Sequence, residues 1–220
     1  MPLSPARMQG SLLSMKFFGL TPDRLGSADG VLLPVHSPGR CVLWGATGFA
    51  LVSLAAYSIW AFRLVAGTGP LYASVAAVYL FASGWILSRL VPPAGRVRYL
   101  VLFTLSFAGY AALWCLCWFG LRGRYHADFY GSVLGLAWLA WLHWRAFGAR
   151  GSWIPAALVL LALHTLGYTV GDDLHALVGG VRGRLLWGLG HGLGFGAGLG
   201  WLLQRAQVAA RPASEAVPAG

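Results

Sequence analysis

Charged residues are scarce in this chain. Its 16 Lys and Arg and 6 Asp and Glu make up 10% of 220 residues, whereas a soluble domain carries about a quarter. Hydrophobic residues reach 58% and the mean hydropathy is +0.67. This balance excludes an ordinary soluble protein. A chain of this length leaves room for one membrane-embedded bundle and for no sizeable soluble domain.

Cysteine is scarce as well, and its placement excludes a common kind of metal site. The three cysteines, Cys41, Cys115 and Cys117, fall at or inside apolar runs, without the histidine or polar neighbours of a zinc site. We therefore interpret them as small packing residues. The first forty residues also lack an apolar core long enough for a cleaved signal peptide, so none is expected.

Six apolar spans are present instead, and short connections join them. They cover residues 41–62, 64–88, 99–121, 129–144, 152–171 and 185–204. Such spans predict an all-α, polytopic transmembrane bundle of six helices in which consecutive helices are antiparallel neighbours. The expected domains are a cytoplasmic N-terminal segment (1–40), a six-helix transmembrane domain (41–204) and a disordered cytoplasmic tail (205–220).

The basic residues predict the orientation of this bundle. With six crossings, eleven Lys and Arg fall on the side of the termini, and five fall on the other side: Arg63, Arg122, Arg124, Arg182 and Arg184. The positive-inside rule then places both termini in the cytoplasm of a multi-pass protein of a bacterial-type cell inner membrane. Because the basic residues flank the spans, we interpret the net charge of +10 as a signal of membrane orientation and not of nucleic-acid binding. The partners that fit are the lipid bilayer and other membrane proteins, with no nucleic acid.

Glycine recurs at every second position of the last span. Gly188, Gly192, Gly196 and Gly200 form one stripe on a helix, and Gly190, Gly194 and Gly198 form a second stripe about 200° away at 100° per residue. Small residues let membrane helices approach closely. We therefore expect 185–204 to be a central helix packed between two neighbours. His191 lies on neither stripe.

A second pattern gathers polar residues at one end of the bundle. His164, Tyr168, Asp172 and His175 fall at about 0°, 40°, 80° and 20° around a helix, which makes one narrow stripe. By rise per residue, His164 and His191 lie roughly 10 Å and 9 Å below the same surface. We therefore expect an outward-facing pocket between the last three helices, formed by His126, Asp128, Ser132, His164, Tyr168, Asp172, His175 and His191. His143 is expected at the cytoplasmic interface, among tryptophans.

Four kinds of site fit such a cluster. A divalent metal could take ligands from His126, Asp128, His164, Asp172, His175 and His191, although the chain has no His-x-x-x-His motif. Two histidines at matched depth, His164 and His191, could instead be the axial ligands of a haem. The cluster could also line a proton or ion path. It could lastly be a hydrogen-bonded seam without chemistry, in a non-catalytic membrane assembly subunit.

One motif carries a family resemblance. His191, Gly194 and Gly198 are spaced like the His-x-x-Gly-x-x-x-Gly of the last core helix in rhomboid intramembrane serine proteases, which this chain also resembles in its six-helix topology. The resemblance implies a membrane hydrolase in which Ser132 is the nucleophile and His191 the general base. The sequence around the serine is Tyr130-Gly131-Ser132-Val133, not Gly-x-Ser-Gly, and residues 71–88 contain neither His nor Asn.

The predicted topology can be tested with reporter fusions. Fusions after Arg63 and after Gly220 should report opposite compartments, because an odd number of crossings separates the two positions. A fusion after Arg150, on the predicted cytoplasmic side, is the matched control and should agree with the fusion after Gly220. The same compartment for Arg63 and Gly220 would contradict the six-crossing topology.

Overall fold

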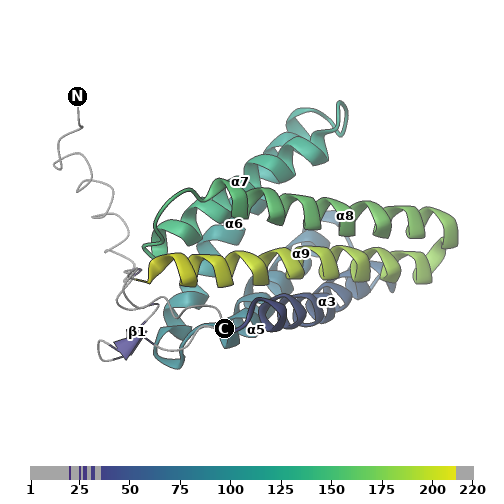
Figure 1. Ribbon diagram of the computed structural model, residues 1–220. Helices are drawn as coiled ribbons and strands as arrows, with labels where there is room; N and C mark the ends of the chain where they lie inside the picture. The colour runs from purple at the N-terminus through teal and green to yellow at the C-terminus, as the bar shows by residue number, and fades with distance from the viewer. Residues whose placement is uncertain (1–19, 21–24, 26, 29–30, 33–35, 212–220) are drawn as a thin grey trace.

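The computed structural model describes residues 20, 25, 27–28, 31–32 and 36–211, and these form an all-helical fold apart from one short strand pair (Figure 1). The strands β1 (Ser27–Ala28) and β2 (Val31–Leu32) pair antiparallel. The helical elements follow in this order: α3 (Pro38–Ala61), α4 (Thr68–Val78), η1 (Tyr79–Ser83), α5 (Gly84–Leu87), η2 (Ser88–Leu90), η3 (Pro93–Gly95), α6 (Arg96–Gly120), α7 (Ala127–Ala146), α8 (Ile154–Val178) and α9 (Gly180–Ala210).

Each of the six predicted spans coincides with a long helical stretch, so the all-α prediction is confirmed. Four of these stretches are long and apolar enough to cross a membrane: Pro38–Ala61, Thr68–Leu90, Pro93–Gly120 and Ile154–Val178. The second of them includes α4, η1, α5 and η2. The helices α7 and α9 are also long but less apolar, because α7 carries an aspartate, a histidine and an arginine and α9 is rich in glycine. The protein is therefore a multi-pass helical membrane protein.

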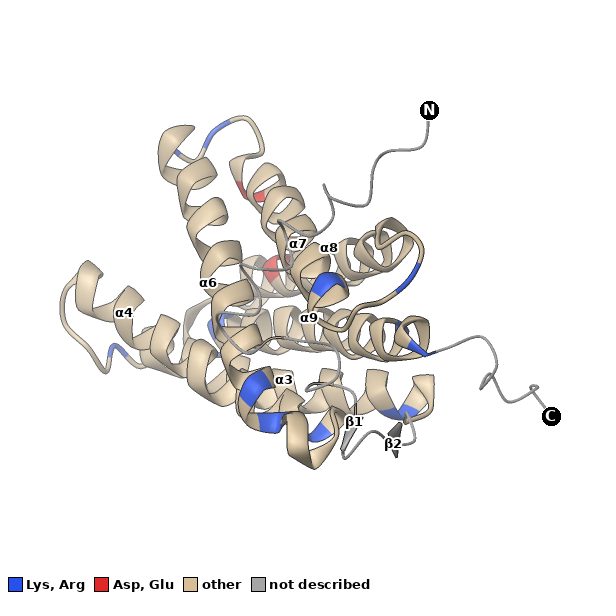
Figure 2. Ribbon diagram, turned by 90° about the vertical axis from the view of Figure 1, so that its left-hand side faces the viewer, with Lys and Arg blue, Asp and Glu red and all other residues tan. Residues whose placement is uncertain are grey.

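The helix α9 lies in the middle of a layer of three. It packs against α3 on one side and against α8 on the other (Figure 1). A second pair, α6 and α7, packs together, and α7 also contacts α8. The helix α4 lies at the edge of the bundle, where it contacts α3 but has none of its eleven residues buried (Figure 2). The arrangement leaves α9 as the helix on which the other elements converge.

The two glycine stripes of α9 account for this central position, as predicted. A Cβ added at Gly196 would lie 2.8 Å from the backbone carbonyl carbon of Gly45 on α3. A Cβ added at Gly194 would lie 2.8 Å from the Cα of Gly167 on α8. Real Cβ atoms do not come so close to backbone, so both neighbours require glycine here. Close backbone contact of this kind is how membrane helices associate without a hydrophobic driving force.

The connection between α8 and α9 differs from the prediction. The last two predicted spans left residues 172–184 between them, whereas α8 continues to Val178 and α9 begins at Gly180. Polar residues do not break a helix that has left the apolar core, so both helices extend beyond it. The break occurs at Gly179, whose φ of 66° and ψ of −178° are accessible only to glycine. Asp172 and His175 are therefore on the helix.

The last helix also extends beyond the last predicted span, which ends at residue 204. The helix α9 runs to Ala210, and Ala206 and Gln207 are buried. The side-chain amide of Gln207 donates to the carbonyl of Leu90, which fixes this end of α9 to η2. Residues 212–220 lie outside the described part of the chain. Most of the predicted N-terminal segment does too, although Leu20 and Leu25 are described and buried.

The glycine packing can be tested by substitution. Gly194→Leu and Gly196→Leu should each destabilise the protein by about 3 kcal/mol or prevent its folding, because the added side chain has no space between the backbones. The measurement is thermal unfolding in detergent. Gly69→Leu on α4 is the control, since a side chain there meets nothing within 4 Å. Unchanged unfolding temperatures for both α9 variants would show that α9 is not packed tightly on two faces.

Candidate functional site

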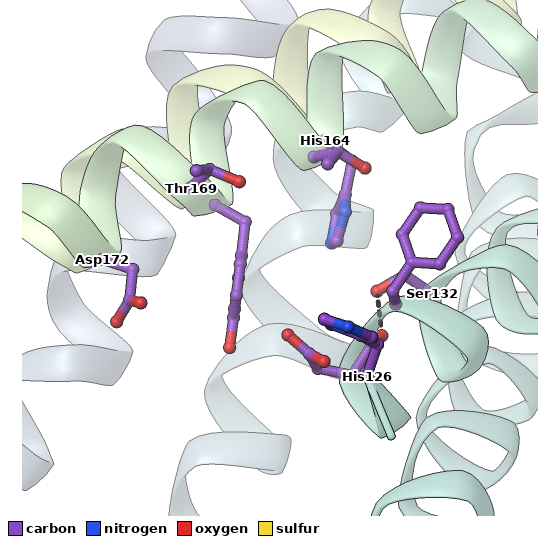
Figure 3. A pocket seen from close by; sticks show the side chains of 9 residues that line it. His126, Ser132, His164, Thr169 and Asp172 are labelled. Carbon is purple, nitrogen blue, oxygen red and sulfur yellow. Dashed lines mark hydrogen bonds between the residues drawn. The ribbon is translucent and has the colours of Figure 1, made fainter. Parts of the chain in front are cut away.

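A pocket of about 350 Å³ lies between the first turns of α7 and the second half of α8 (Figure 3). Eight of its nine lining residues have polar side chains. From α7 and the residue before it come His126, Asp128, Phe129 and Ser132, and from α8 come His164, Thr165, Tyr168, Thr169 and Asp172. The i, i+4, i+8 spacing of His164, Tyr168 and Asp172 directs all three toward α7. This part of the predicted stripe therefore faces the pocket.

The wall contributed by α7 is built around the start of that helix. His126 precedes the first residue of α7 and has a φ of 56°, a left-handed conformation that is strained for a side-chain-bearing residue. Asp128 follows in the first turn, where a negative charge interacts favourably with the helix dipole. The hydroxyl of Ser132 donates to the backbone carbonyl of Asp128, at 2.8 Å (Figure 3).

His164 is the most buried residue of the pocket wall. Only 2% of the residue is exposed, and its imidazole points from α8 into the pocket (Figure 3). Its Nε2 lies 3.2 Å from the hydroxyl of Tyr110 on α6. Gly135 of α7 leaves the space for that tyrosine, because a Cβ there would lie 2.6 Å from the Tyr110 ring. The Nδ1 of His164 is buried without a hydrogen-bond partner.

His191 lies directly behind His164. The two imidazole rings are in edge-to-face contact, with centroids 5.3 Å apart. The Nδ1 of His191 is 3.5 Å from the hydroxyl of Tyr79, and that hydroxyl is 2.8 Å from the hydroxyl of Ser53 on α3. The predicted approach of the two histidines is thus confirmed.

Sequence reasoning missed the two tyrosines that contact these histidines. Tyr79 and Tyr110 are both buried and come from the second and third spans, far from the histidines in sequence. Tyr79 begins η1, a π-helical turn of five residues. Such turns insert an extra residue into a helix and are frequent at functional sites. The sequence signal that could have identified them is a tyrosine inside an apolar span, since its hydroxyl needs a hydrogen-bond partner in the bilayer.

A layer of phenylalanines closes the bundle below the histidine pair. Phe195 is one turn along α9 from His191, and its ring centroid is 4.9 Å from that of His164. Phe49 of α3 and Phe107 of α6 pack against Phe195, with centroids 5.0 and 6.1 Å away. All three are buried. The polar groups around the histidines are therefore separated from the other half of the bundle by these packed rings.

The predicted pocket differs from the observed one in its boundaries. It was expected between the last three helices, but α9 contributes no lining residue. His191 is behind the wall, and His175 stacks on Trp187 with ring centroids 5.4 Å apart. His143 also differs: it is fully buried, with its ring 5.9 Å from that of Tyr99, not at an interface.

The predicted metal site is not supported. Among the residues that the structure describes, no three His, Cys, Asp or Glu side chains are grouped so that they could hold a metal ion. The expected set of His126, Asp128, His164, Asp172, His175 and His191 is divided between the pocket, its back wall and the Trp187 stack.

The predicted haem site also fails on geometry. Axial ligands must face each other across the macrocycle, but the rings of His164 and His191 touch edge to face. The space around them is filled by Tyr57, Tyr79, Tyr110, Tyr168 and Phe195. No gap for a haem lies between the two histidines.

The Ser132–His191 dyad implied by the rhomboid resemblance is not formed. Ser132 bonds to the carbonyl of Asp128, and His191 contacts Tyr79 and His164. The imidazoles that share the pocket with Ser132 are His126 and His164. No family model, no curated protein and no solved structure matches this chain. The rhomboid resemblance stays a prediction.

The contact between Tyr79 and Ser53 can be measured by a double-mutant cycle. Tyr79→Phe and Ser53→Ala should each destabilise the protein by about 1–3 kcal/mol, because each leaves the other hydroxyl with one partner fewer in the core. The double variant should lose less than the sum, with a coupling of roughly 0.5–1.5 kcal/mol. The measurement is unfolding in detergent. Tyr72→Phe, at a tyrosine that is 57% exposed, is the control. If the destabilisation in the double variant equalled the sum of the two single effects, the contact between the hydroxyls would be contradicted.

Proposed function

We propose that this chain is a multi-pass protein of a bacterial-type inner membrane with six crossings and both termini in the cytoplasm. In this proposal, the pocket between α7 and α8 opens to the non-cytoplasmic side and binds a small ligand there. The orientation is supported by the uneven distribution of basic residues between the two sides. The pocket lies where α7 begins and α8 approaches its end, at the end of the bundle that holds the α6–α7 and α8–α9 connections.

The observation that carries the proposal is the chemical character of the pocket wall. Eight polar side chains from α8, α7 and the residue before α7 surround one cavity, and the most buried of them, His164, has a nitrogen without a hydrogen-bond partner. Polar and ionisable groups inside a membrane domain are costly to keep unless they are used. A cavity of about 350 Å³ is within the range of small-molecule sites.

A binding site that opens at one end of the bundle fits the structure better than a path that conducts protons or ions across the membrane. Proton or ion transfer across the membrane needs polar groups or water along the whole path. Here Phe195 contacts both histidines, and Phe49 and Phe107 pack against Phe195. A ligand can therefore enter from one end of the bundle, but these rings interrupt the polar groups on the way to the other end.

Hydrolysis of a bound ligand is our second candidate. It is favoured by one observation, the presence of Ser132 and the imidazoles of His126 and His164 in the same pocket. It ranks second because the serine hydroxyl donates to a backbone carbonyl, and no hydrogen bond is found between it and either imidazole.

Cysteine labelling tests whether the pocket opens to the non-cytoplasmic side. In a variant with all three native cysteines replaced by alanine, Thr165→Cys and Thr169→Cys should react with a membrane-impermeant maleimide added from that side. Leu166→Cys is the matched control: it lies next to Thr165 at the same depth, but its side chain is 61% exposed on the outside of the bundle, where lipid excludes the reagent. Labelling from the cytoplasmic side only, or equal rates for residues 165 and 166, would contradict the proposal.

A further inference from the structure

Two of the three acidic residues in the described part of the chain line the same pocket. The two are Asp128 and Asp172, and the third is Asp173. They come from α7 and α8, the two helices that carry the red segments in Figure 2. The lining contains no Arg or Lys. Within the described residues, neither Asp128 nor Asp172 forms an ion pair. In a chain with a net charge of +10, this pocket is a local site of negative charge.

His164 independently indicates that the pocket holds a ligand. The residue is 2% exposed and points into the cavity, but its Nδ1 has no hydrogen-bond partner. A buried imidazole nitrogen without a partner is costly, and such groups in native proteins are normally satisfied by something. The pocket wall therefore includes a buried polar atom that no described residue satisfies.

Aromatic rings complete the wall. Phe129 and Tyr168 line the same cavity as the two aspartates. The face of an aromatic ring attracts a cation, and organic ammonium groups are recognised by aromatic side chains in this way. Carboxylates supply the opposite charge and accept hydrogen bonds from N–H groups. The two kinds of side chain together are suited to an ammonium group.

From these observations we infer that the pocket between α7 and α8 binds a small organic ammonium ligand, with Asp128 and Asp172 as its counter-charges. This inference rests on the proposed function and adds the chemical class of the ligand. A metal ion is not favoured, because the described residues offer no set of three ligating side chains. An anion is not favoured, because two carboxylates and no basic side chain of Arg or Lys would surround it.

The ammonium group could belong to a free amine or to an ethanolamine lipid headgroup. The chemistry recognised is the same in both cases. The two sources differ in the phosphodiester that a lipid headgroup carries next to its amine, so soluble compounds can distinguish them.

The test is ligand binding to the purified full-length protein in detergent, with three probes that share one ring and differ in charge: benzylamine, benzyl alcohol and benzoate. Benzylamine should bind at least tenfold more tightly than the other two. Asp128→Asn and Asp172→Asn should each weaken benzylamine binding about tenfold, since each removes one charge-assisted hydrogen bond. Asp173→Asn is the matched control, because Asp173 is adjacent to Asp172 but does not line the pocket. It should bind benzylamine as the unmodified protein does.

Two outcomes would overturn the inference: benzylamine binds no better than benzyl alcohol or benzoate, or Asp173→Asn weakens binding as much as Asp172→Asn. If benzyl alcohol binds well and Thr165→Cys still reacts from the non-cytoplasmic side, the proposed pocket function stands and only the ligand class is wrong.

If benzylamine binds as expected, glycerophosphoethanolamine distinguishes a lipid headgroup from a free amine as the source of the ammonium group. Binding tenfold tighter than ethanolamine supports a lipid headgroup, and weaker binding supports a free amine.

Discussion

Backbone-to-backbone contact along α9 is the constraint on which the rest of the structure depends. Glycines on opposite faces of α9 bring α3 and α8 so close that a single Cβ would collide with backbone on either side. Gly131 and Gly135 of α7 repeat the arrangement against α6. Because lipid is as apolar as the side chains, this packing replaces the hydrophobic effect as the source of specific association. It also fixes where the remaining side chains of α9 can be.

The candidate site follows from that packing. His191 lies on neither glycine stripe, so its ring is directed between α3 and α8, where it meets His164 and Tyr79. Gly192 leaves space for Ser53, since a Cβ there would lie 2.7 Å from the Cβ of that serine. The histidine pair forms the back of a pocket whose front wall is the start of α7. Close packing on one side of α8 and a polar cavity on the other are thus two consequences of one arrangement.

The sequence predicted the periodic features well and the non-local ones poorly. The glycine stripes, the six long helices and the pairing of His164 with His191 follow from spacing along single helices. Tyr79 and Tyr110 were missed because their histidine partners are more than fifty residues away in sequence. The helical stripe through Asp172 and His175 was predicted by spacing, but the end of α8 was not, because the apolar span stops at residue 171 whereas a glycine with positive φ, Gly179, ends the helix. The position of α7 relative to α9 is a packing outcome that no spacing encodes.

Solid-state NMR of the protein in lipid bilayers, with isotopic labels in histidine alone, tests the central claim most directly. Glycine packing of α9 predicts a ring-to-ring cross-peak between His164 and His191, whose ring centroids are 5.3 Å apart. The cross-peak should vanish in a His164→Phe variant, which assigns it, and in Gly194→Leu, which separates α9 from α8. Absence of the cross-peak in the unmodified protein, or its persistence in Gly194→Leu, would contradict the claim that glycine contacts along α9 place the two histidines together.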